Sequence, residues 1–164
     1  MKRSILTGWL CSMLALVGAC DMIAQRELRP GQSTVEDVRK LMGKPGMIWE
    51  ETDGSQVFEY ARGPEGFETW MVRIGPDGIY RGMKNALVPE NLARVQPGTS
   101  RDDLRRLLGK PGSEESFPAR GEVVWTWRVK GDVAATEMFH AHLGADGRVL
   151  RTSRSPDPNL LKGG

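Results

Sequence analysis

The sequence predicts an α+β protein made of two tandem copies of one unit. In each unit two helices precede a three-stranded antiparallel meander and pack on one face of its sheet. The segment STVEDVRKLMGKPG at 33–46 aligns without gaps on TSRDDLRRLLGKPG at 99–112, which indicates an internal duplication. Runs of alternating apolar residues follow each copy, and they enclose the hairpin signals GPDG at 75–78 and GADG at 144–147.

The first twenty residues have the build of a bacterial export signal. Lys2 and Arg3 precede a mostly apolar stretch at 5–17, which is too short to span a membrane comfortably. The following Val-Gly-Ala-Cys resembles a lipobox, in which cleavage falls before a cysteine that is then acylated. We expect residues 1–19 to be a lipoprotein signal peptide and Cys20 to be the lipid attachment site. The alternative is an ordinary cleaved signal followed by a cysteine with no special role.

Composition excludes several classes of function. The chain of 164 residues is 39% hydrophobic and 27% charged, which is typical of a folded protein. Removal of Lys2 and Arg3 from its 23 basic residues would leave 21 basic and 21 acidic residues, so nothing indicates nucleic-acid binding. If Cys11 leaves with the signal and Cys20 is acylated, no thiol remains for a disulfide or a cysteine-based metal site.

The repeated segment is predicted to be a helix with a defined start and end. A hydroxyl residue can cap the amino end, and an aspartate three residues later can complete a capping box. A glycine and then a proline end the helix. The residues concerned are Thr34, Asp37, Gly43 and Pro45 in the first copy, and Ser100, Asp103, Gly109 and Pro111 in the second. A phosphate-binding loop would need its glycines before the helix, so we interpret Gly-Lys-Pro-Gly as helix termination.

The remaining elements follow in the same order in both copies. Short helical segments at 21–28 and 89–95 precede the repeated helix. The strand signals are Val57–Arg62, Phe67–Gly75, Ile79–Lys84, Glu122–Lys130, Thr136–Leu143 and Arg148–Ser153. A weak strand pattern also occurs at 47–52, and its counterpart at 113–118 is less regular still, so the expected meander keeps three strands. The first repeat is expected at 20–86, the second at 87–153, and a disordered tail at 154–164.

Strand alternation separates a core face from an open face in each sheet. Residues such as Phe58, Trp70, Trp125 and Trp127 fall on the inward side. The opposite side carries the candidate binding face, which consists of Thr69, Met71 and Arg73 in the first copy and Met138, His140 and His142 in the second. The alternative is that these open faces are only solvated.

No catalytic constellation is evident in the sequence. His140 and His142 are the only histidines, and a third residue for a two-histidine metal site is not obvious. No Gly-x-Ser-x-Gly motif occurs. We expect no enzymatic activity, no cofactor and no metal, and the alternative is a hydrolase or metal enzyme that uses the two histidines.

The order of Pro-Gly, hydroxyl cap, acidic third residue, Leu-Gly-x-Pro, aromatic strand and closing hairpin resembles the SmpA/OmlA (BamE-like) family of outer-membrane lipoproteins. That family shares the fold type of the β-lactamase inhibitor protein, which also has two tandem copies. The resemblance implies a non-enzymatic lipoprotein that binds envelope proteins and assists outer-membrane β-barrel assembly or envelope integrity. The BamE-like proteins have one copy where this chain has two, and the shared residues are structural, so partner-binding positions do not carry over.

The expected partners are a membrane, through the acylated cysteine, and envelope proteins that include the β-barrel assembly machine. No small-molecule substrate is evident. An alternative function is an inhibitor or sensor of a periplasmic enzyme or ligand. We expect an envelope location facing the periplasm. The resemblance favours the outer membrane, although Asp21 after Cys20 resembles an inner-membrane retention signal of enteric bacteria.

Overall fold

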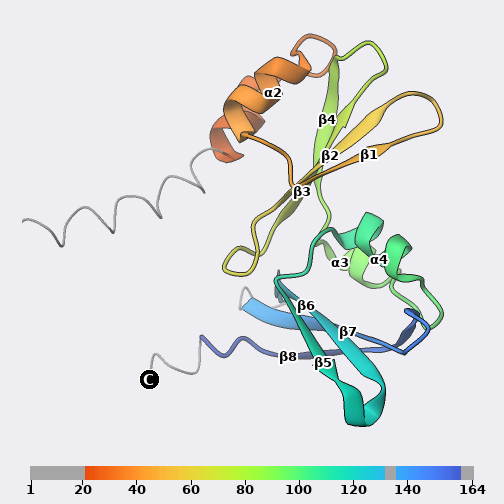
Figure 1. Ribbon diagram of the computed structural model, residues 1–164. Helices are drawn as coiled ribbons and strands as arrows, with labels where there is room; N and C mark the ends of the chain where they lie inside the picture. Colours follow the sequence, from red (N-terminus) through yellow and green to blue (C-terminus); the bar gives the residue numbers. More distant parts are fainter. Residues whose placement is uncertain (1–20, 132–135, 160–164) are drawn as a thin grey trace, which may run out of the picture. The chain divides into compact units, whose positions relative to one another are not determined.

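The computed structural model describes residues 21–131 and 136–159. The described chain is α+β, as predicted, and contains two four-stranded antiparallel sheets (Figure 1). Strands that are neighbours in sequence are neighbours in each sheet, in the orders β1-β2-β3-β4 and β5-β6-β7-β8. The predicted signal peptide and Cys20 lie outside the described residues. No helix in the described ranges is both long and apolar enough to cross a membrane.

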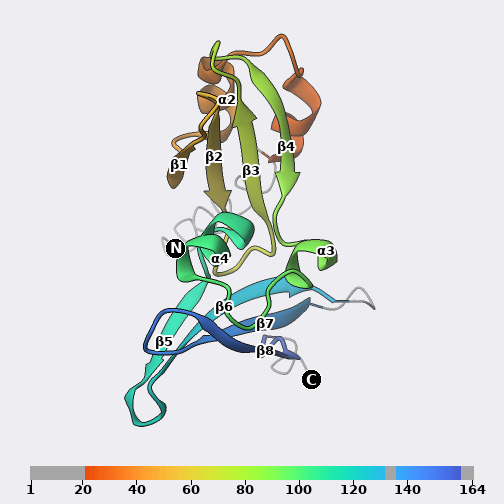
Figure 2. The same cartoon turned by 90° about the vertical axis from the view of Figure 1, so that its right-hand side faces the viewer.

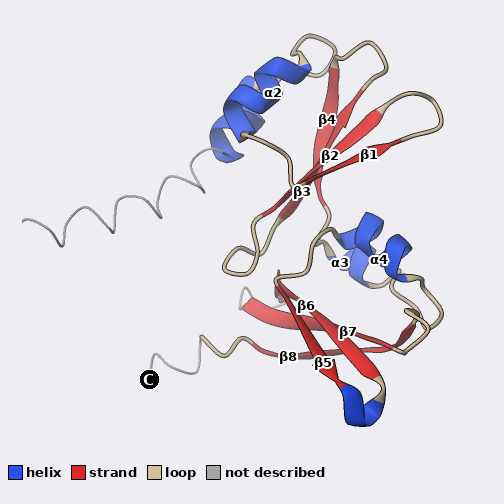
Figure 3. Ribbon diagram, viewed as in Figure 1, coloured by secondary structure: helices blue, strands red, loops and turns tan. Residues whose placement is uncertain are grey.

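The first sheet follows two helical segments (Figure 3). Residues 21–27 are helical. The elements after them are α2 (Val35–Met42), β1 (Met47–Glu50), β2 (Gln56–Ala61), β3 (Thr69–Ile74) and β4 (Tyr80–Asn85).

The second sheet repeats this order and adds one short 3-10 helix between its first two strands. Its elements are α3 (Pro89–Leu92), α4 (Arg101–Leu108), β5 (Ser113–Phe117), η1 (Pro118–Arg120), β6 (Glu122–Lys130), β7 (Thr136–Leu143) and β8 (Val149–Pro156).

Each sheet has four strands, which corrects the predicted three-stranded meander. The additional strands are β1 and β5, which lie at the two positions with the weakest strand patterns in the sequence. β5 pairs with β6 from Ser113 opposite Thr126 to Phe117 opposite Glu122, yet all five of its residues are exposed. An edge strand that buries no side chain is held by backbone hydrogen bonds, so its sequence need not alternate.

The repeated helices begin and end at the predicted residues. Thr34 caps α2 and forms a capping box with Asp37, while the Ser100 hydroxyl accepts a hydrogen bond from the Asp103 N–H at the start of α4. Gly43 ends α2 through a hydrogen bond from its N–H to the Arg39 carbonyl, and Gly109 ends α4 in the same way on Arg105. In both copies the first helical N–H donates to the glycine carbonyl of the closing hairpin, from Val35 to Gly78 and from Arg101 to Gly147. The repeated motif therefore joins each helix to its own sheet.

The second sheet packs its inward face against α3 and α4 (Figure 2). Trp125 and Trp127 meet edge to face with ring centroids 6.0 Å apart, and Trp127 also packs on Phe139 at 6.3 Å. The helices contribute apolar residues that include Leu104 and Leu108, both fully buried. The inward set predicted for this copy is therefore confirmed.

Contacts divide the described residues into two compact units. One consists of residues 21–58 and Val72–Met83, and the other of Glu59–Met71 and the described residues from Lys84 onward. The second unit therefore includes the end of β2, the loop after it and the beginning of β3. Within that unit the carboxylate of Glu59 accepts hydrogen bonds from the Arg105 guanidinium at 3.0 and 3.1 Å and from the Lys110 N–H at 3.1 Å.

The segment expected to be a disordered tail from residue 154 is ordered through residue 159, so this prediction is wrong for its first half. β8 continues to Pro156 and pairs with β7. Asp157 is fully buried, and its carboxylate accepts hydrogen bonds from the Arg128 guanidinium, the Thr136 hydroxyl and the Asn159 N–H. The hydrogen bond from Thr136 makes the largest contribution to lowering the pKa of Asp157. A polar anchor of this kind leaves no apolar pattern in the sequence. Residues 160–164 lie outside the described range.

Candidate functional site

The open face predicted on the first sheet is only partly open. Arg73 is exposed and Met71 is half-buried, but Thr69 is 1% exposed, so the prediction for Thr69 is wrong. The physical reason is the carboxyl end of α4, because Gly109 lies so close that a Cβ atom there would be 2.5 Å from the Thr69 methyl carbon. The exposed Arg73 forms an ion pair with Asp53 at 3.2 Å.

The predicted residues of the second copy, Met138, His140 and His142, lie on one face of β7, away from the core. The strand register places His140 opposite Thr126 on β6 and opposite Ser153 on β8. The same register places Met138 opposite Ser155. The open face of the second sheet therefore brings imidazoles and hydroxyls together from three neighbouring strands.

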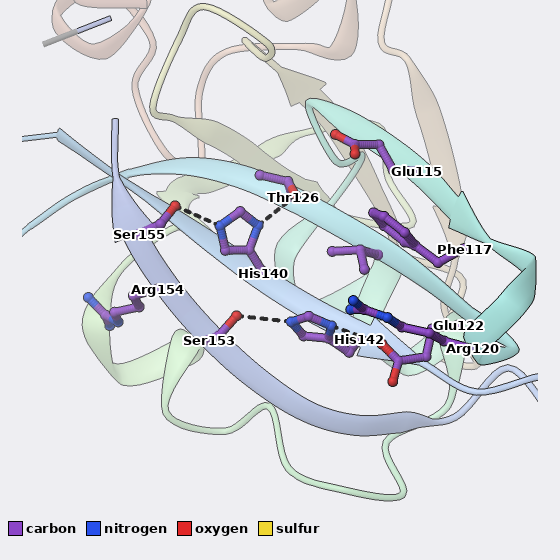
Figure 4. A pocket seen from close by; sticks show the side chains of 11 residues that line it. Glu115, Phe117, Arg120, Glu122, Thr126, His140, His142, Ser153, Arg154 and Ser155 are labelled. Carbon is purple, nitrogen blue, oxygen red and sulfur yellow. Dashed lines mark hydrogen bonds and ion pairs between the residues drawn. The ribbon is translucent and has the colours of Figure 1, made fainter. Parts of the chain in front are cut away.

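This face is hollowed into a pocket of about 310 Å³, which we call the histidine pocket (Figure 4). β5, η1, β6, β7 and β8 all contribute side chains to it. Its lining residues are Glu115, Phe117, Arg120, Glu122, Val124, Thr126, His140, His142, Ser153, Arg154 and Ser155. Met138 lies on the same face but does not line the pocket.

His140 is held between two hydroxyl groups. Its Nδ1 lies 2.9 Å from the Thr126 hydroxyl and its Nε2 lies 2.9 Å from the Ser155 hydroxyl. Burial lowers the pKa of His140 below its ordinary value of 6.5, and the neighbouring His142 adds to this shift while Glu115 opposes it. The ring is therefore neutral at neutral pH and becomes charged only in acid.

His142 is held between a carboxylate and a hydroxyl. Its Nδ1 lies 3.3 Å from the Glu122 carboxylate, and its Nε2 lies 2.9 Å from the Ser153 hydroxyl. Glu122 also accepts hydrogen bonds from the Arg151 guanidinium at 3.0 and 3.4 Å. Because the carboxylate can only accept, the neutral ring carries its proton on Nδ1 and accepts the Ser153 proton at Nε2.

The contacts from Ser153 through His142 to Glu122 follow the order of a nucleophile, a base and a carboxylate that orients the base. Two features of the site differ from that arrangement. Arg151 shares the Glu122 carboxylate, which weakens the hold of that group on the imidazole. The second histidine has no carboxylate bonded to its ring and is bracketed by hydroxyls instead. The pair is thus best described as part of a polar hydrogen-bonded surface.

One wall of the pocket is aromatic and basic. Phe117 at the end of β5 is 38% exposed, which is high for a phenylalanine side chain. The Arg120 guanidinium lies 5.9 Å from the centre of the Phe117 ring, at cation–π distance. This wall offers an apolar surface beside a positive charge.

The described residues contain no group of three or more histidine, cysteine, aspartate or glutamate side chains placed to hold a metal ion. The two histidines instead make hydrogen bonds through both ring nitrogens. The cap and turn residues of the repeated helices, from Thr34 to Pro111, lie at helix ends and turns and do not line the histidine pocket.

The sequence prediction missed most of this pocket. Ser153 and Ser155 fall on the same side of β8 by simple alternation, but nothing local shows that this side faces the two histidines. Thr126 lies between Trp125 and Trp127 in the sequence, and the alternation there indicates only which side of the strand faces the core. Cross-strand partners depend on the strand register, and the alternation pattern of a single sequence does not specify that register.

Comparison with known proteins adds little to this description. No family model and no curated protein matches the sequence. One similar solved structure is a DUF4309 family protein, YjgB, from Bacillus subtilis, at 15% identity over 80% of this chain and 83% of that chain, with a TM-score of 0.31. Another is a protein from Streptococcus mutans named as a candidate β-lactamase inhibitor, at 13% identity over 84% of this chain and 96% of that chain, with a TM-score of 0.33. At TM-scores this low, neither likeness bears on function, so the SmpA/OmlA resemblance rests on the repeated residues alone.

Proposed function

We propose that this chain is a non-enzymatic lipoprotein of the bacterial envelope that binds other envelope proteins through the open face of its second sheet. The observation that carries this proposal is the histidine pocket. Its side chains project from four strands and one short helix, and hydrogen bonds hold both histidines in place. Side chains fixed on strands make a preformed surface, which lowers the cost of binding a partner.

The anchoring part of the proposal rests on the sequence of the first twenty residues. Basic residues, an apolar stretch and the lipobox-like Val-Gly-Ala-Cys arrive in the order that export and acylation require. Acyl chains on Cys20 would hold the protein at a membrane surface, since each buried CH₂ group contributes ~0.8 kcal/mol. The folded units would then face the periplasm.

In its most specific form the proposal is an accessory role in outer-membrane β-barrel assembly. The resemblance of both repeats to the SmpA/OmlA pattern supports this role. The shared residues are caps, core positions and turns, so the resemblance supplies no partner-binding positions. The histidine pocket supplies positions that can be tested.

Crosslinking and affinity capture of the full-length lipoprotein from cells test this proposal. The site variant is Phe117→Asp, which places a charge on the exposed aromatic wall of the pocket. The matched control is Leu150→Asp, because Leu150 is also an exposed apolar residue on an edge strand, at 48% exposure, but does not line the pocket. We expect partners captured by the wild type and by the control to be lost in Phe117→Asp.

The identity of the captured protein decides between the forms of the proposal. Components of the β-barrel assembly machine would support the accessory role. A periplasmic enzyme whose activity falls on addition of the purified lipoprotein would support the inhibitor alternative instead. Equal capture by the wild type and Phe117→Asp would show that binding does not use this face.

Two further measurements test the anchor and the location. Cys20→Ser should abolish incorporation of labelled fatty acid, and continued labelling would exclude acylation at this cysteine. Separation of the two membranes on a density gradient should place the wild-type protein with the outer membrane. Recovery with the inner membrane would indicate that Asp21 acts as a retention signal.

A further inference from the structure

Protonation of the two histidines changes the direction of nearby hydroxyl groups. A neutral imidazole has one donor and one acceptor nitrogen. Neutral His142 therefore donates to Glu122 and accepts from the Ser153 hydroxyl. Neutral His140 donates to one of its two hydroxyl partners and accepts from the other.

A protonated imidazole donates from both nitrogens, so every partner must accept. Ser153 can no longer donate to His142, and neither Thr126 nor Ser155 can donate to His140. The two hydroxyl groups that donated a hydrogen bond to a neutral ring must therefore rotate so that their O–H bonds point away from it. These hydroxyls line the histidine pocket, which gives the released protons an open space to point into (Figure 4).

The fixed charges around the two rings cancel, so the protonation state of the histidines sets the net charge of the pocket. The charged groups on this face are Glu115 on β5, Arg120 on η1, Glu122 on β6, and Arg151 and Arg154 on β8. Arg128, one row further along β6, is bound to the buried Asp157, and Arg154 is bound to Glu137. Outside these two ion pairs, two negative and two positive charges surround the neutral rings, and protonation of an imidazole adds a positive charge.

We propose that the histidine pocket binds a carboxylate carried by an acidic segment of a partner protein, and that this binding strengthens as His140 becomes protonated. The inference rests on the proposed function, because it names the partner chemistry of the same face. Released hydroxyl protons and charged imidazoles are suitable donors for an oxyanion, and charge-assisted hydrogen bonds are the strong ones.

Two features favour a carboxylate side chain over a phosphate. The carboxylates of Glu115 and Glu122 line the pocket and repel a dianion more than a monoanion. Phe117 offers apolar contact for the methylene groups that carry a glutamate carboxylate. The pocket, at about 310 Å³, has room for such a side chain.

The probe for this inference is a fluorescein-labelled tetraglutamate peptide, titrated with the full-length chain in non-ionic detergent and followed by fluorescence anisotropy. We expect affinity at pH 5.0 to exceed affinity at pH 7.5 by about tenfold, the scale of one charge-assisted hydrogen bond. A tetraglutamine peptide should bind weakly at both pH values. His140→Gln with His142→Gln should remove the pH dependence, since glutamine keeps hydrogen-bonding capacity without the charge.

Further variants separate the site from general electrostatics. Ser153→Ala with Ser155→Ala should weaken peptide binding at pH 5.0 several-fold, because the released donors are gone. Lys110→Gln removes one positive charge outside the pocket, and we expect it to leave the pH dependence intact.

The inference is overturned if the wild type binds equally at both pH values, or if the double glutamine variant keeps the wild-type pH dependence. Inorganic phosphate that displaces the peptide at lower concentration than acetate does would replace a carboxylate site by a phosphate site. Failure of cellular capture with intact peptide binding would instead count against the proposed envelope partner, so the two failures are distinguishable.

Discussion

The repeated glycines allow one comparison in which the chain supplies its own control. Gly43 and Gly109 occupy the same position in the two copies, with φ of +83° and +76° and ψ of −158° and −167°. Residues with a Cβ atom are strained in this region by ~1–3 kcal/mol. Gly43→Ala and Gly109→Ala should therefore share one backbone cost.

The surroundings of the two glycines differ. A Cβ atom on Gly43 would meet nothing within 4 Å, whereas one on Gly109 would lie 2.5 Å from the Thr69 methyl carbon and 3.2 Å from the Met71 methyl carbon. Overpacking of this kind adds ~1–3 kcal/mol. We expect Gly43→Ala to lower the free energy of unfolding by ~1–3 kcal/mol and Gly109→Ala by that amount plus the packing term.

Urea unfolding of the full-length chain, followed by tryptophan fluorescence, measures both losses. Thr69→Ser removes the methyl group that the new Cβ atom would strike, so it should recover part of the loss in Gly109→Ala and none of the loss in Gly43→Ala. Equal losses in the two alanine variants would show that the packing of Gly109 on Thr69 has no energetic weight. A larger loss at Gly43 would refute the reasoning altogether.

Three other variants test the second unit. Arg105→Ala should lower the free energy of unfolding by ~3–5 kcal/mol, because it leaves the Glu59 carboxylate buried without its charged partner. Glu59→Gln should lower it less, because the Arg105 side chain that loses its partner is partly exposed. A larger loss for Glu59→Gln than for Arg105→Ala in urea unfolding would contradict this prediction. Trp127→Ala should cost ~3–5 kcal/mol as a large core truncation, and a loss below 1 kcal/mol would mean that the core is wrongly identified. The pKa of His140 is lowered, so the unfolded chain binds its proton first and stability should fall as pH drops below about 6.5. His140→Gln should flatten this fall in melting temperature between pH 7 and pH 5, and an unchanged slope would assign the effect to other groups.

Local patterns correctly predicted the elements that depend on neighbouring residues. The caps at Thr34 and Ser100 and the glycine stops lie within one helical turn of what they bind, so sequence spacing specifies them. The inward face of β6 and β7 followed from alternation, because side chains on a strand point to opposite faces by geometry. The Thr69 prediction failed because alternation says nothing about which distant element covers a face.

In the histidine pocket, too, the sequence predicted local features but not contacts between distant segments. Alternation was enough to place His140 and His142 on the open side of the second sheet. It could not show that Ser153, Ser155, Thr126 and Glu122 hold the two rings, since these contacts span 11 to 20 residues of sequence.

The sequence by itself determined a duplicated α+β unit, the ends of its repeated helices and the core side of the strands in its second sheet. These features arise from spacing over a few residues, where backbone geometry is nearly fixed. Only the tertiary structure decided that Asp157 anchors the end of the chain, that Gly109 covers Thr69 and that three hydroxyls bracket the imidazoles. Such contacts depend on strand register and on the packing of distant segments, which are set by the free energy of the whole fold.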